Sequence, residues 1–179
     1  TVAYDESSNR LMVFGGCGLP GCSPLSNEVW ILTNADATGG APAWLQLTPT
    51  GAAPAARNGA HGFYDPGSNR LVVYGGGDVA GGKFQDLWVL TNANGLGGTP
   101  SWIKLLDTSP MGQRYGENSA YDPTSKRAIY HAGLSGFDSA PYSDTWILQN
   151  ADATTGSPRW VQAASAGNPG SGRNGPVIY

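Results

Sequence analysis

Acidic residues and arginines recur at fixed places along this chain, and they are its first candidates for chemistry. The acids are Glu28, Asp86 and Asp144, each two positions before a tryptophan, and the arginines are Arg10, Arg70 and Arg127, each at the start of a similar strand. Carboxylates held beside cations can act as general acids and bases. Residues present in every copy of a pattern are explained more economically as scaffold, so we favour structural pairs that satisfy buried polar groups.

The two histidines and three long polar loops give weaker indications of a site. His61 and His131 lie in expected strands, where a packed or channel-lining histidine is favoured over a catalytic base, a switch or a ligand. The polar loop residues are Asn34, Asp36, Asn92, Asn94, Asn150 and Asp152. They could hold calcium, but loop-stabilising hydrogen bonds are favoured because the middle copy has no carboxylate. The sequence has no Ser-His-Asp spacing, phosphate loop or metal-ligand cluster, so we expect no cofactor and no metal.

Composition narrows the class of protein. The chain has 179 residues, 40% of them apolar, and a formal net charge of −3, which describes a globular protein. Its 27 glycines, 13 prolines and only 13% charged residues favour short strands joined by turns. The lysines and arginines are spread singly, so nucleic acid is not an expected partner. We expect no membrane span and no signal peptide, although the chain starts at Thr1 rather than methionine.

Both cysteines, Cys17 and Cys22, lie in one short loop. Glycine and proline between them let the segment bend, so we predict a local disulfide and, with it, an extracellular or cell-surface location. Two free thiols in a cytosolic loop are the alternative. Zinc is less favoured, because a structural site needs about four ligands and neither histidine is nearby in the sequence.

One unit repeats three times along the chain. Tyr4, Tyr64, Tyr121 and Tyr179 are spaced by 60, 57 and 58 residues, and the same landmarks recur between them. Each unit has an Arg-led segment, a turn, a strand ending in Gly-Gly, a strand of the form acidic-x-Trp and a strand opened by Trp. Four strands per unit predict one propeller blade per unit. A two-sheet sandwich is the alternative, but it would leave a polar outer face on most strands.

Together these motifs resemble bacterial kelch repeats, which also occur in galactose-oxidase-like propellers. The resemblance covers the whole chain and rests on segments such as "RNGAHGFYD" (57–65), "SNRLVVYGG" (68–76) and "QDLWVLT" (85–91). It implies an all-β, kelch-type propeller with three four-stranded antiparallel blades at about 1–60, 61–117 and 118–176, and a further inner strand starting in 173–179. We expect essentially all tryptophans to be buried. The third copy departs from the pattern, with "YHAG" at 130–133 instead of aromatic-Gly-Gly.

The resemblance also implies where a ligand binds. In kelch rings, the loop after Gly-Gly and the loop before the Arg-led strand lie on one face around the central opening, and here the first of these loops differs most between copies. Aromatic residues with scattered charges suit a sugar or a peptide. The candidate ligand-binding residues are Arg57, Asp78, Lys83, Phe84, Arg114, Phe137, Asp138, Tyr142 and Arg173. Solvated loops that bind nothing are the alternative.

These observations favour a secreted or surface module that binds carbohydrate or protein. The alternatives are part of a propeller oxidase, lyase or epimerase with catalytic residues partly outside this chain, or a structural self-assembling unit. Propellers use about 4 to 8 blades, so three repeats form an incomplete ring. We therefore expect the partners to be the remaining blades of a larger propeller or further copies of this chain.

Overall fold

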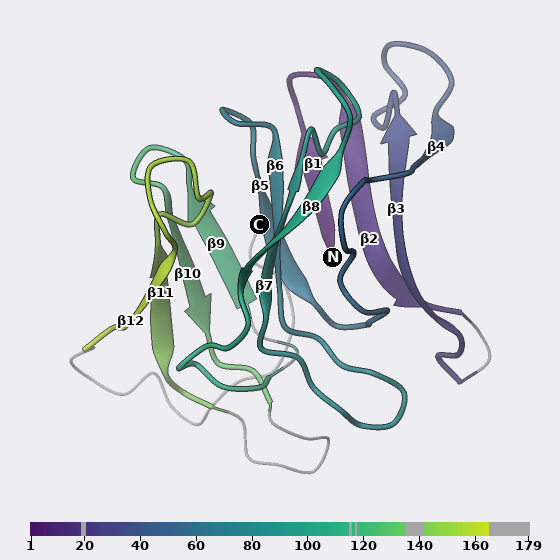
Figure 1. Ribbon diagram of the computed structural model, residues 1–179. Coiled ribbons are helices and arrows are strands. Elements are labelled where there is room, and N and C mark those ends of the chain that lie inside the picture. Colours follow the sequence, from purple (N-terminus) through teal and green to yellow (C-terminus); the bar gives the residue numbers. More distant parts are fainter. Residues whose placement is uncertain (19–20, 115, 117, 135–141, 165–179) are drawn as a thin grey trace.

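The computed structural model describes residues 1–18, 21–114, 116, 118–134 and 142–164, and in these ranges the chain is all-β (Figure 1). The strands are β1 (Val2–Asp5), β2 (Arg10–Cys17), β3 (Leu25–Thr33), β4 (Ala43–Leu47), β5 (His61–Asp65), β6 (Arg70–Tyr74), β7 (Leu87–Thr91), β8 (Ser101–Leu106), β9 (Asn118–Asp122), β10 (Arg127–His131), β11 (Thr145–Gln149) and β12 (Arg159–Gln162). Over the described residues, no helix could serve as a membrane span.

Consecutive strands pair into three antiparallel sheets of four: sheet 1 (β1–β4), sheet 2 (β5–β8) and sheet 3 (β9–β12). Turn chemistry explains this simple order. In the turn after β5, the Asp65 carboxylate accepts hydrogen bonds from the backbone N–H and hydroxyl of Ser68. Asn69 then takes a positive φ, as the equivalent Asn9 and Lys126 also do, and returns the chain as the next strand. The repeated Asp-to-Arg segment is therefore a hairpin turn used three times.

The sheets stack face to face, with their first strands β1, β5 and β9 as neighbours (Figure 1). Sheet 2 lies in the middle, and both of its faces are covered. One face packs Leu71, Val73 and Trp88 against sheet 1, and the other packs Val72 and Tyr74 against sheet 3. Because successive side chains on a strand point to opposite faces, a strand apolar at every position needs a neighbouring sheet on each side. The expected stack of three four-stranded antiparallel blades is confirmed.

The burial of the tryptophans follows this stacking, with one correction. Trp88, Trp102 and Trp160 are buried between sheets, whereas the Trp44 side chain is 57% exposed. The expectation that essentially all tryptophans are buried is wrong for Trp44, because no sheet of the described residues covers the side of sheet 1 on which it lies, and Trp30 and Trp146 are only half-buried. The repeat boundaries remain a prediction, and the segment 173–179 lies outside the described residues.

Candidate functional site

The loops that differ most between the repeats gather at one end of the stacked sheets, opposite the hairpin turns (Figure 1). We call this the variable-loop end. It includes the segments after β2 and β6 and the segments that lead into β5 and β9. Its geometry is built on an arginine brace beneath the loops.

In sheet 2 the brace joins an arginine, an aspartate and two aromatic rings. The buried guanidinium of Arg57 binds Asp86 through two contacts, Nη1 to Oδ1 at 2.7 Å and Nη2 to Oδ2 at 3.0 Å. It also donates to the Gly75 carbonyl at 2.9 Å and lies 4.0 Å from the centre of the Phe84 ring. The indole of Trp88 donates to Asp86 Oδ2 at 2.7 Å. Arg57 is thereby held below the loop surface.

The carboxylate of Asp86 is kept ionised by this brace. Burial raises its pKa, but the hydrogen bonds from Arg57 and Trp88, together with the Arg57 charge, outweigh burial and hold the pKa below its usual value. The ionised carboxylate holds the guanidinium in place, and both of its oxygens already accept hydrogen bonds from Arg57 and Trp88.

Sheet 3 repeats the brace residue for residue. Arg114 binds Asp144 through Nη1 at 2.7 Å and Nη2 at 3.2 Å, the Trp146 indole donates to the same carboxylate at 2.7 Å, and the Tyr142 ring lies 4.1 Å from the guanidinium. Arg114 is buried, like Arg57. The spacing aromatic-x-Asp-x-Trp, common to 84–88 and 142–146, is the sequence signal from which this stack could have been predicted.

The expected pairing of acids with strand-opening arginines is corrected here. Asp86 and Asp144 pair with Arg57 and Arg114, at the variable-loop end. Arg10 and Arg70 lie at the hairpin-turn end of the sheets. The length of a strand separates them from the acids at the variable-loop end, so they cannot pair with these acids. Arg10 and Arg70 instead reach across to the next sheet, where they donate to the backbone carbonyls of Asn94 and Asp152.

Sheet 1 has only part of the brace. Glu28 accepts from the Trp30 indole at 3.0 Å and from the Gln46 amide at 3.1 Å, and no arginine among the described residues binds it. Ser26 stands where the other sheets have an aromatic ring.

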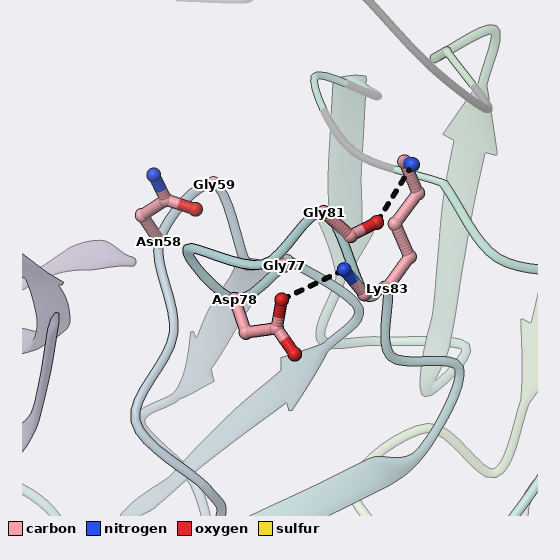
Figure 2. A pocket seen from close by; sticks show the side chains of 7 residues that line it. Asn58, Gly59, Gly77, Asp78, Gly81 and Lys83 are labelled. Carbon is pink, nitrogen blue, oxygen red and sulfur yellow. Dashed lines mark hydrogen bonds between the residues drawn. The ribbon is translucent and has the colours of Figure 1, made fainter.

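A pocket of about 230 Å³ opens between the segment before β5 and the loop after β6 (Figure 2). Its lining residues are Asn58, Gly59, Gly77, Asp78, Gly81, Gly82 and Lys83. Two reciprocal backbone hydrogen bonds between Asn58 and Gly77, at 3.1 and 2.9 Å, join its walls. The four glycines add no side chain to the pocket wall, and the backbone groups of Gly77, Gly81 and Gly82 are hydrogen-bonded within this region.

The pocket rim carries one acid and one amine. Asp78 Oδ1 accepts the backbone N–H groups of Ala80 at 2.9 Å and Gly82 at 2.7 Å, which folds the loop over (Figure 2). Lys83 Nζ donates to the Gly81 carbonyl at 3.3 Å on the opposite side of the same loop. These groups and the backbone can exchange hydrogen bonds with a polar, hydroxyl-bearing ligand.

The predicted disulfide is confirmed and touches the pocket wall. Cys17 and Cys22 are bonded, and the Asn58 amide donates to Cys22 Sγ at 2.9 Å. The bridge therefore joins the loop of sheet 1 to the pocket of sheet 2.

The structure brings together some of the predicted ligand-binding residues. Asp78 and Lys83 line the pocket, whereas Phe84 and Arg57 contact each other and lie next in sequence to the lining residues Lys83 and Asn58. Arg114 and Tyr142 form the separate brace of sheet 3. Phe137, Asp138 and Arg173 lie outside the described residues. Sequence reasoning missed Asn58 and the glycines, although Asn58 directly follows Arg57 in the sequence.

Metal chemistry finds no support in the part of the chain that the structure describes, where no three His, Cys, Asp or Glu side chains are grouped for metal binding. The long-loop residue Asn94 makes hydrogen bonds instead, from its side-chain amide to Asp5 Oδ2 at 2.8 Å and from the Leu96 N–H to its own side-chain oxygen at 2.9 Å.

Comparison with known proteins identifies the architecture. No protein-family model matches the sequence, and no curated protein matches it. The chain is similar to the structure of YjhT, a kelch-type propeller protein, with a TM-score of 0.70 and 15% identity over 98% of this chain and 53% of YjhT. This chain forms three blades of a β-propeller.

A second solved structure gives the same result. The chain is similar to one in the cryo-EM structure of RAG in complex with one melted and one unmelted RSS, with a TM-score of 0.64 and 14% identity over 96% of this chain and 51% of that one. Likeness at this level of identity shows the fold alone. The chain spans about half the length of both matched chains, so its three blades form an incomplete propeller.

Proposed function

We propose that these three blades belong to a binding module that recognises a carbohydrate at the variable-loop end. The observation that carries the proposal is the pocket lined by Asp78 and Lys83, because these two residues have no counterpart in the other repeats, while the arginine brace of the same sheet recurs in sheet 3. A repeated part is scaffold, and a part that varies on a rigid scaffold is where binding residues concentrate.

The chemistry of the pocket favours a sugar unit. At about 230 Å³ it is smaller than the roughly 300–1,000 Å³ of drug-sized ligand sites, so it suits one ring at the end of a glycan. The Asp78 carboxylate and the Lys83 amine match sugar hydroxyls, because a hydroxyl both donates and accepts hydrogen bonds. Phe84, the next residue after Lys83, stacks on the Arg57 guanidinium and so fixes the end of the pocket loop.

The proposal includes an extracellular or cell-surface location. The Cys17–Cys22 bond supports it, because such a bond persists in oxidising compartments.

The test is a glycan array followed by titration calorimetry with the best glycan. We expect Lys83→Met and Asp78→Asn to weaken binding about tenfold each, the loss of roughly one charge-assisted hydrogen bond. Lys104→Met and Asp107→Asn are matched controls, since they alter an exposed lysine–aspartate pair elsewhere on sheet 2. A flat array, or equal binding by all four variants, would overturn the proposal. If the pocket instead bound a protein and that binding depended on Lys83, the proposed ligand would be a peptide and not a carbohydrate.

A further inference from the structure

The outer face of sheet 1 carries the same kinds of apolar residue as the equivalent face of sheet 2, but no other sheet of the described residues covers it. Its apolar residues are Leu11, Val13, Trp30, Leu32 and Trp44, and a hollow of about 370 Å³ is lined by Val13, Trp30 and Trp44. The equivalent residues of sheet 2 are Leu71, Val73, Trp88, Leu90 and Trp102, which are at most 5% exposed because sheet 1 covers them.

The outer face of sheet 3 is the other half of the same kind of junction. It presents Ile129, His131, Thr145 and Ile147, at the positions that Met12, Phe14, Val29 and Ile31 occupy in sheet 1. In sheet 1 those four residues are buried against sheet 2, whereas Ile129 is 46% exposed. The chain therefore carries both halves of a blade-to-blade junction, one at each end of the stack (Figure 1).

The two junctions inside the molecule use the same contacts. Phe14 meets the edge of Trp102 with ring centres 5.0 Å apart, and Tyr74 meets Trp160 at 5.1 Å. At the hairpin-turn end, Arg10 Nη1 donates to the Asn94 carbonyl at 2.9 Å. This second contact also recurs, with Arg70 Nη1 donating to the Asp152 carbonyl at 2.8 Å. A third junction of the same kind would therefore contain the same two contacts, a ring against a tryptophan and an arginine donating to a loop carbonyl.

We propose that the outer face of sheet 3 binds the outer face of sheet 1 of a second copy of this chain. In that junction His131 packs on Trp44 of the other copy, and Arg127, which is exposed in the single chain, donates to the Asp36 carbonyl. Two copies joined head to tail make this contact twice, which closes a ring. Since one chain spans 53% of YjhT, two chains supply about the length of that propeller.

The polar part of the junction predicts how tightly the copies bind. Inside the molecule, Asp5 faces Asn94 at 2.8 Å, and the buried acids Asp65 and Asp152 are bridged by Lys126 at 3.1 and 3.3 Å. At one internal junction an acid therefore faces an amide, and at the other two acids face each other with a cation between them.

Between copies, Asp122 faces Asp36, and the residue in the place of Lys126 is Asn9. The two carboxylates then face each other with no cation between them. Replacing Asp122 by asparagine restores the acid–amide pair seen between Asp5 and Asn94, so it should tighten the junction.

The experiment is sedimentation velocity and light scattering on the full chain over a concentration series. We expect a dimer, with Trp44→Asp raising the dissociation constant about tenfold or more, since it places a charge at the centre of the contact. Asp122→Asn and His131→Phe should each lower it, the second by restoring the aromatic pair of the other junctions. Val79→Asp is the control, because Val79 is 66% exposed at the variable-loop end.

A folded monomer at the highest concentration would overturn the proposal and would leave this face to further blades of a longer polypeptide. An assembly indifferent to Trp44 and Asp122 would overturn it as well. Circular dichroism of each variant shows whether the fold is kept. Glycan binding by the pocket does not enter this test, so the two proposals stand or fall separately.

Discussion

Single residues with special backbone geometry decide whether the variable-loop end can form. Gly76 and Gly81 both have φ near +86°, a region that L-residues avoid, but they differ in surroundings. A Cβ on Gly76 would lie 2.6 Å from the Asn58 carbonyl oxygen, whereas a Cβ on Gly81 would meet nothing within 4 Å.

This difference predicts unequal effects of the same substitution. Gly81→Ala should lower the free energy of unfolding by about 1 kcal/mol from backbone strain alone. Gly76→Ala should cost roughly 2 kcal/mol more, because two backbone segments must also move apart. Urea unfolding of both variants measures this, and equal losses would show that the Asn58 segment yields freely.

A second prediction at this scale concerns the acid response. Burial lowers the pKa of His61 from 6.5 to about 4. Between these values the unfolded chain binds a proton that the folded chain does not, so stability present above pH 6.5 is lost progressively as the pH falls towards 4. His61→Gln should flatten the stability profile in that window while leaving the profile between pH 7 and 8 parallel to that of the unchanged protein. An unchanged slope between pH 6.5 and 4 in the variant would assign the effect elsewhere.

At the scale of elements, the arginine brace ties the segment before β5 to the start of β7. Asp86→Asn leaves the buried Arg57 cation without its counter-ion, and we expect a loss of about 3 kcal/mol in the free energy of unfolding. Asp107→Asn, which breaks the exposed pair with Lys104, should change stability very little. Denaturant melts of the two variants make the comparison. If the two losses were similar, the brace would be a surface contact rather than a buried anchor.

At the scale of the whole molecule, two equivalent strand positions differ in whether another sheet covers them. Leu90 is fully buried between sheets 1 and 2, and Leu32 is its equivalent on the open face of sheet 1. Leu90→Ala should cost about 2–5 kcal/mol. Leu32→Ala should cost less than half as much in dilute solution. Thermal unfolding over a range of protein concentrations should bring the two losses together if copies associate, and a concentration-independent gap would count against association.

The sequence by itself determined the all-β class, the four-strand unit, its three copies and the local disulfide. These are short-range properties, in which turns such as Asp65–Arg70 and the bend between Cys17 and Cys22 are encoded by neighbouring residues. Strands that are apolar on both faces also predicted that the sheets would stack.

Only the tertiary structure decided which residues meet. Arg57 and Asp86 are 29 positions apart and join because antiparallel strands bring their ends to one edge, which local patterns do not report. The same holds for Asn58 beside Asp78 in the pocket and for Asp65 beside Lys126 between sheets. Trp44, Trp102 and Trp160 share one sequence pattern, yet Trp44 is exposed, because burial depends on whether another sheet lies beyond it.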